Sequence, residues 1–113
     1  MHVVSPEDTA EALGSGDVPV LGTPRVVALV EAATVAALAG RLAVGETSVG
    51  TRVDLEHLRP SAVGAEVRAE ATLERVEGAR LEFTVAVTAD GRDVARGRVE
   101  RMVVSRAKFL SRL

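Results

Sequence analysis

Residues 26–39 (VVALVEAATVAALA) form an apolar run of helix-forming length that only two polar side chains interrupt. Thr23 and Pro24 precede the run and are typical of a helix start, because threonine can cap free N–H groups and proline has no N–H to leave unpaired. The pattern predicts a helix from Pro24 to about Leu42. Since apolar residues fall on nearly every side, we expect the helix to be buried on most faces.

The chain after this helix alternates between apolar and polar residues, which is typical of half-buried strands. In residues 47–58, the face predicted to look toward the helix carries Val49, Val53, Leu55 and His57, and the opposite face carries Arg52, Asp54 and Glu56. Residues 65–106 predict three more strands, with turns near Glu77-Gly78 and at Asp90-Gly91, because Asp-Gly between alternating segments favours a hairpin. We expect a four-stranded antiparallel meander, with residues 1–4 as a candidate fifth strand and residues 5–24 irregular.

One apolar helix followed by antiparallel strands predicts an α+β fold in which the sheet curls around the helix. Such a sheet leaves edges and one face open, and a symmetric partner is the usual way to cover them, so we expect a homo-oligomer. A length of 113 residues fits one domain, residues 1–113, with a single modest core.

Composition narrows the class of protein further. The chain has no cysteine, which excludes disulfides, thiolate zinc sites and a cysteine nucleophile. A net charge of −2 with mixed signs offers no basic patch for nucleic acid. The N-terminus lacks the pattern of a secretory signal, and residues 26–39 are too few to span a bilayer. We therefore expect a soluble cytoplasmic protein without membrane or nucleic-acid partners.

Glu31 is the most unusual residue of the predicted helix. Its neighbours one turn away are Val27, Val30, Thr34 and Val35, so the pattern leaves it no wet face. An unpaired buried carboxylate costs several kcal/mol, so Glu31 must pair, shift its pKa or sit in a cleft. Carboxylates in such clefts are commonly general bases or nucleophiles. A helix carboxylate that reaches solvent or pairs with an arginine is the alternative.

Three further residues could carry chemistry. His57 lies on the strand face predicted to look toward the helix, where it is either a core histidine or an acid–base partner of Glu31. Gly50 interrupts its strand, so it marks either a bulge or a backbone N–H free to bind an oxyanion. Thr23 is explained by helix capping alone, and direct contact with Glu31, about 12 Å away along the helix axis, is not expected within one chain. No metal-ligand cluster, phosphate loop or nucleophile-elbow motif occurs, so we expect neither metal nor cofactor.

These four residues carry a resemblance to a known family. In the segment LGTPRVVALVEAATVAALAGRLAVGETSVGTRVDLEH, their order and spacing resemble the hotdog-fold thioesterases, and within them the fluoroacetyl-CoA thioesterase-like group. The resemblance runs from about Val20 to Lys108, and the stretches ERVEGARLEFTVAV and GRVERMVVSRAKF are similar to the last strands of that family.

The resemblance implies about five antiparallel strands wrapped around one long helix, assembled as a homodimer or tetramer with pockets near the interface. It also implies hydrolysis of an acyl-CoA thioester, with Glu31 and His57 as acid–base or nucleophilic pair. Gly50 would supply an oxyanion N–H, and Thr23 would hydrogen-bond near the acyl carbonyl. Whether Glu31 acts as base or nucleophile stays open.

The chain also departs from that family. Fluoroacetyl-specific members carry an aromatic lid before the threonine, whereas this chain has no aromatic residue before Phe83. Its GSGDVPVL stretch argues against fluoroacetate specificity and leaves the acyl group open. A non-catalytic hotdog protein that binds an acyl-CoA or another small ligand is the alternative function. An enoyl-CoA hydratase is disfavoured because the helix lacks the aspartate and histidine which that chemistry uses.

Overall fold

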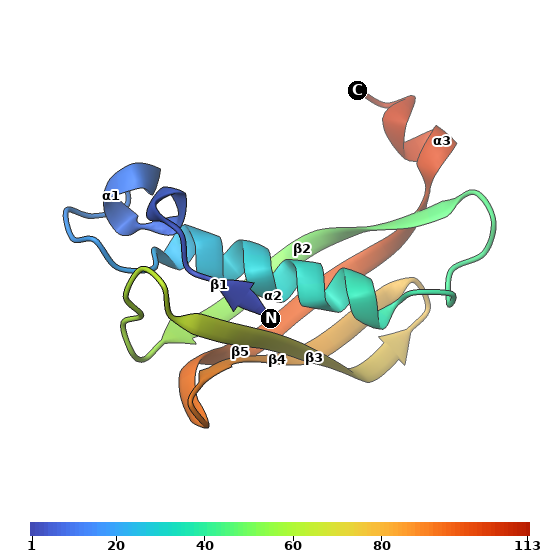
Figure 1. Cartoon of the computed structure of the whole chain (residues 1–113). Helices are drawn as coiled ribbons and strands as arrows, with labels where there is room; N and C mark the ends of the chain where they lie inside the picture. The colour runs from blue at the N-terminus through green and yellow to red at the C-terminus, as the bar shows by residue number, and fades with distance from the viewer.

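The computed structural model of the chain describes all 113 residues. Its elements, in chain order, are β1 (His2–Val3), the 3-10 helix η1 (Pro6–Asp8), α1 (Ala10–Leu13), α2 (Thr23–Ala37), β2 (Glu46–His57), β3 (Glu66–Glu77), β4 (Arg80–Ala89), β5 (Arg92–Ser105) and α3 (Arg106–Leu110). The five strands form one antiparallel sheet that curls around α2, as predicted, while α3 projects from the body (Figure 1). The candidate fifth strand is confirmed as β1, which pairs with β3. Residues 5–24 were predicted to be irregular, yet they contain the short helices η1 and α1.

The strand order is β1-β3-β4-β5-β2, so the predicted four-strand meander is only partly correct. β3, β4 and β5 follow one another as hairpins, but β2 pairs with β5 at the far edge of the sheet. The connection between β2 and β3 therefore crosses from one edge of the sheet to the strand next to the other edge. Because the sheet curls, its two edges approach each other around α2, and eight residues (58–65) are enough for the crossing.

The two predicted turns are confirmed. Asp90 and Gly91 have φ values of +50° and +74° and connect β4 to β5. Positive φ at both central residues is the requirement of the tight hairpin turn that suits the twist of the strands. Gly78, with φ +58°, lies in the turn that connects β3 to β4.

A β-bulge after Gly50 corrects the predicted faces of β2. Gly50 pairs with Arg101 and Arg52 pairs with Glu100, so one extra residue lies between the two pairs. The extra residue shifts the alternation by one position. Gly50 thereby joins Val53, Leu55 and His57 on the helix side, whereas Val49, which the sequence pattern assigned to that side, lies on the opposite face.

α2 differs from its prediction in length and in burial. It ends at Ala37 rather than near Leu42, and Gly40 follows in the left-handed region at φ +74°. Only every fourth residue is fully buried, namely Val26, Val30, Thr34 and Leu38. The opposite face is apolar but exposed, and its residues are Ala28, Ala32, Val35, Ala36 and Ala39. The expectation that α2 is buried on most faces is thus wrong for one chain, because the sheet covers only one side of the helix.

The core lies between the buried stripe of α2 and the concave face of the sheet. β4 provides its centre, with Leu81, Phe83, Val85 and Val87 alternating inward. Val99 of β5 and Val67 of β3 complete the contact with the helix. No helix combines the length and the apolarity needed to cross a membrane.

A buried carboxylate fastens the N-terminal segment to the start of α2. Asp8 accepts hydrogen bonds from the Ser5 N–H (2.9 Å) and hydroxyl (3.1 Å), contacts the His2 imidazole (2.6 Å) and pairs with Arg25 of α2 (3.0 Å). Its carbonyl accepts a bond from the Gly22 N–H (2.9 Å). Burial alone would raise the pKa of Asp8, but the bonds from Ser5 and His2 outweigh it and lower the pKa to about 2.

We predict that Asp8→Asn lowers the free energy of unfolding at pH 7 by about 2 kcal/mol, the equivalent of the lowered pKa. A carboxylate whose pKa is lower in the folded state stabilises the fold above its unfolded pKa of 3.8, and this stabilisation is lost as the pH falls toward 2. Urea unfolding between pH 7 and pH 2 measures both effects. Glu7→Gln, at an exposed neighbour without an ion pair, should change little; an equal loss in both variants would contradict the prediction.

Candidate active site

The structure gives Thr23 a different partner from the one predicted. The cap of α2 is Gly22, and Thr23 is the first residue of the helix, so its hydroxyl does not cap the helix. The hydroxyl instead lies 2.8 Å from Nδ1 of His57, the last residue of β2. The hydrogen bond joins the start of the helix to the end of the strand and fixes the imidazole ring.

His57 is partly buried, and its second ring nitrogen has no protein partner. Nε2 is enclosed but makes no hydrogen bond. Burial lowers the pKa of His57 below 6.5, and the nearby backbone of Arg59 offsets this only in part. The ring is therefore neutral at pH 7, and one nitrogen is free for a further proton donor or acceptor. A buried polar atom without a partner is a common feature of sites that bind something else.

Glu31 lies against Gly50, eight residues along α2 from Thr23. A Cβ atom added to Gly50 would overlap Oε1 of Glu31 and come within 3.2 Å of its Cδ. The predicted bulge is present next to Gly50, and the carboxylate approaches the strand backbone there closely. The role of the Gly50 N–H in binding an oxyanion stays a prediction. The carboxylate is half-buried between the helix and β2.

Arg101, which the sequence pattern did not single out, is buried between β2, β5 and α2. Its guanidinium donates from Nε to the Ser48 hydroxyl (2.9 Å), from Nη2 to the Ser48 carbonyl (3.0 Å) and from Nη1 to the Thr34 hydroxyl (3.5 Å). Thr34 in turn donates to the backbone carbonyl of Glu31 (2.6 Å). A signal was present in the sequence, because Arg101 occupies an inward position between Val99 and Val103 in the alternation of β5.

Arg101 and Glu31 are neighbours across Gly50. The added Cβ of Gly50 that would overlap Glu31 would also lie 3.4 Å from Nη1 of Arg101. The two charged groups do not form an ion pair, so the guanidinium relies on hydroxyl and carbonyl partners. A buried charge needs such hydrogen bonds to be tolerated. The arrangement places a fixed cation and a carboxylate side by side at the centre of the helix.

The four predicted residues thus form two pairs rather than one cluster. Thr23 and Glu31 are about 12 Å apart along the helix axis, and Gly50 and His57 are roughly 20 Å apart along β2. No hydrogen bond or ion pair joins Glu31 to His57 within the chain. The Thr23–His57 pair lies at one end of the helix, and the Glu31–Gly50 pair lies at its middle.

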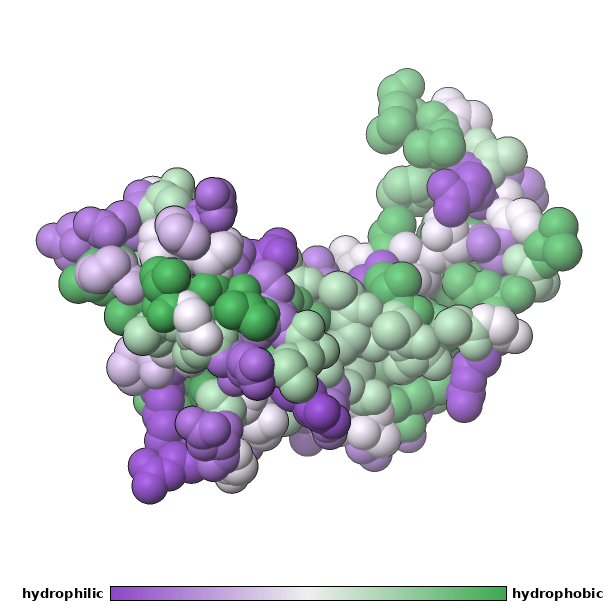
Figure 2. Space-filling model, in the orientation of Figure 1, coloured by the Kyte–Doolittle hydropathy of each residue, from purple (hydrophilic) through white to green (hydrophobic).

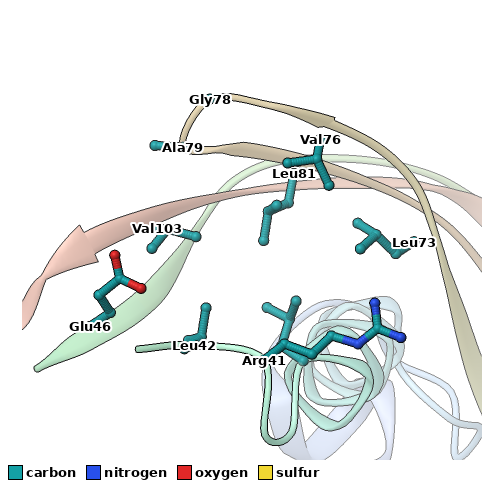
Figure 3. A pocket seen from close by; sticks show the side chains of 10 residues that line it. Arg41, Leu42, Glu46, Leu73, Val76, Gly78, Ala79, Leu81 and Val103 are labelled. Carbon is teal, nitrogen blue, oxygen red and sulfur yellow. The ribbon is translucent and has the colours of Figure 1, made fainter. Parts of the chain in front are cut away.

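An apolar cleft of about 490 Å³ occupies the other end of α2. Figure 3 shows aliphatic side chains that converge on it from the helix end and the sheet, with Arg41 and Glu46 at its border. The aliphatic residues that line it are Leu38, Leu42, Leu73, Val76, Ala79, Leu81 and Val103. None of the four predicted site residues lines it. The cleft suits an aliphatic group and contains no aromatic side chain.

Comparison with known proteins identifies relatives of the chain. A family model described as fluoroacetyl-CoA-specific thioesterase matches residues 4–107. The fluoroacetyl-CoA thioesterase of Streptantibioticus cattleyicolor is 36% identical over 90 residues, which are 80% of this chain and 65% of that protein. The match thus spans just under two thirds of that relative.

Solved structures resemble the whole fold. A fluoroacetyl-CoA thioesterase crystallised as a mutant with fluoroacetate and CoA is 32% identical, with a TM-score of 0.91 over 98% of this chain and 91% of that chain. A thioesterase-superfamily member from Thermus thermophilus is 31% identical, with a TM-score of 0.90 over 97% and 82% of the two chains. A hotdog-like protein from Thermanaerovibrio acidaminovorans is 29% identical, with a TM-score of 0.89 over 98% and 82%. The predicted fold and family resemblance are confirmed.

We predict that Gly50→Ala lowers the free energy of unfolding by at most about 1 kcal/mol, the low end for overpacking, because the new Cβ meets the flexible end of the half-buried Glu31 side chain. The backbone of Gly50 needs no left-handed conformation, so the cost would come from displacing the Glu31 carboxylate. In a Glu31→Ala background the same substitution should cost much less, which a double-mutant cycle measured by urea unfolding at one protein concentration reveals. Equal costs in both backgrounds would show that the bulge, and not the carboxylate, requires glycine.

Proposed function

Because the chain belongs to the fluoroacetyl-CoA-specific thioesterase family, we propose that it hydrolyses an acyl-CoA thioester to a free acid and CoA. In this reaction a water oxygen bonds to the acyl carbon, the carbon–sulfur bond breaks, and a proton passes to the thiolate of CoA. The site must therefore hold a proton acceptor near the water and hydrogen-bond donors near the carbonyl oxygen.

Glu31 and His57 are the proton-transfer groups of the proposal. Glu31 either takes the proton from water or attacks the acyl carbon itself, forming an anhydride that water then cleaves. His57 is neutral at pH 7, because burial lowers its pKa, and its free Nε2 can accept a proton and return it to the leaving thiolate. Thr23, held by His57, would hydrogen-bond near the acyl carbonyl, and the Gly50 N–H would stabilise the oxyanion.

The observation that carries the proposal is the contact between Glu31 and Gly50. The missing side chain of Gly50 leaves the carboxylate directly on the strand backbone, beside a buried guanidinium. A purely structural helix carboxylate would not need a glycine opposite it.

We further propose that the active site is composite, built from two copies of the chain. β2 is an edge strand with one side unpaired, and the apolar face of α2 next to it is exposed, with Val35 at 53%. A symmetric partner pairing antiparallel along β2 would cover both. Gly50 lies in the first half of β2 and His57 at its end, so pairing across the middle brings the Glu31–Gly50 pair of one copy toward the Thr23–His57 pair of the other.

The proposed acyl group is aliphatic. The residues before Thr23 that correspond to an aromatic lid in the fluoroacetyl-specific enzymes contain no aromatic side chain. The cleft at the end of α2 is lined by leucine, valine and alanine. Fluoroacetyl-CoA is accordingly expected to be a poor substrate compared with short or branched aliphatic acyl-CoAs.

We predict that Glu31→Gln lowers turnover by at least about 10²-fold, the usual contribution of an acid–base group. Thiol release from short, branched and aromatic acyl-CoAs measures turnover and also identifies the acyl class. Glu70→Gln, at an exposed carboxylate on the outer face of β3, is the control and should leave the rate unchanged. Folded native protein without turnover on any substrate would favour a binding protein, and equal rates in native and Glu31→Gln protein would remove Glu31 from the mechanism.

The composite site predicts complementation between two inactive variants. When Glu31→Gln and His57→Ala chains are co-expressed, half of the dimers are mixed, and each mixed dimer contains one site without either substitution. Activity should therefore return to about a quarter of the native value. If Glu31 and His57 of the same chain form the site, every site carries a substitution and no activity returns.

A further inference from the structure

The C-terminal arm, residues 106–113, has apolar side chains that nothing in its own chain covers. It comprises α3 and the three residues after it, and it stands away from the body (Figure 1). Phe109, Leu110 and Leu113 are exposed by 38%, 51% and 94%. Phe109 is one of only two aromatic residues in the chain. Apolar side chains gathered on a projecting element indicate a surface that contacts a partner.

The arm leaves the sheet at the beginning of β2. Ser105, the residue before α3, pairs with Glu46, and the Arg106 N–H donates to the Gly45 carbonyl (2.9 Å). The opposite end of β2, at His57, lies next to Thr23 and the N-terminal segment, residues 5–22, that precedes it. The molecule is 41 Å long, and five helical residues extend only about 8 Å, so the arm does not reach this segment in its own chain.

We propose that the arm of each copy docks on the N-terminal segment of the second copy. The inference rests on the two-copy arrangement proposed above. Antiparallel pairing along β2 places the beginning of one β2 beside the end of the other. The arm follows β5 and lies beside the beginning of β2. In this arrangement it therefore lies near the end of the partner that contains Thr23 and His57.

The two surfaces are complementary in charge. The arm carries three cations, Arg106, Lys108 and Arg112, and no carboxylate side chain. The N-terminal segment carries the exposed carboxylates Glu7, Glu11 and Asp17 and no cation, and none of the three forms an ion pair in its own chain. Opposite charges on facing surfaces fix the register of an interface and disfavour other partners.

Both surfaces also contain exposed apolar side chains. Figure 2 shows a saddle, with the hydrophilic N-terminal region at one raised end, the hydrophobic tip of the arm at the other, and the apolar surface of α2 between them. Leu13 and Val18 of the N-terminal segment are exposed and can receive Phe109 and Leu110. Docking there places Phe109 of one copy beside the Thr23–His57 pair of the other.

Cross-linking tests the inference directly, because the chain contains no cysteine of its own. The double variant Val18→Cys/Leu110→Cys is treated with a short bismaleimide at low protein concentration and run on a denaturing gel. We expect a covalent dimer of about twice the 11.8 kDa chain mass. The matched control is Val44→Cys/Leu110→Cys. Val44 is fully exposed at the root of the arm in its own chain, and in the proposed dimer it lies far from the arm of the partner, so no covalent dimer is expected.

Each outcome decides the inference. A covalent dimer in the first variant but not in the control supports docking on the partner. The inference is overturned if both variants give equal yields of covalent dimer. It is also overturned if Val18→Cys/Leu110→Cys links only within one chain, or does not link while sedimentation shows a dimer. A native chain that sediments as a monomer overturns the arm contact together with the composite site. Thiol release from acyl-CoA, measured separately on the variant before cross-linking, reports on the proposed hydrolysis. If the cross-link forms but no thiol is released, only the proposed hydrolysis is contradicted.

Discussion

The organisation of this protein depends on one mismatch between the helix and the sheet. α2 is apolar on nearly every side, but a single curled sheet covers only the stripe from Val26 to Leu38. The remaining apolar face lies beside the unpaired edge of β2. Removing this apolar face from water would favour association with a second copy. The proposed composite site and the arm contact both assume such a partner, paired along the free edge of β2.

At the centre of the fold, the buried guanidinium of Arg101 is tolerated because hydroxyl and backbone carbonyl atoms accept its hydrogen bonds. Arg101 is buried without an ion-pair partner, yet Ser48 and Thr34 satisfy its guanidinium. Glu31 lies across from it because Gly50 has no side chain to occupy the space. The core around it consists mainly of valine, leucine and alanine with Phe83, so this small network is one of the few polar places in the interior.

The N-terminal segment shows a different solution to the same problem. Asp8 is buried, but hydrogen bonds from Ser5 and His2 keep it ionised. Its ion pair with Arg25 fastens the segment to α2. These contacts hold the segment against the start of α2, next to Thr23. Its outer surface remains acidic, and this surface matches the basic arm at the other end of the chain.

The sequence alone determined the elements whose signals are local. It predicted the central helix, the alternating strands, the Asp90-Gly91 turn and an irregularity at Gly50, because periodicity and turn chemistry depend on neighbours in the chain. Thr23, Glu31, Gly50 and His57 were found as unusual residues and by family resemblance. Only the tertiary structure decided that β2 pairs with β5, that Val49 faces outward and that Thr23 bonds to His57. It also revealed the buried Arg101, because strand pairing, the shift at a bulge and the burial of a side chain depend on residues distant in sequence.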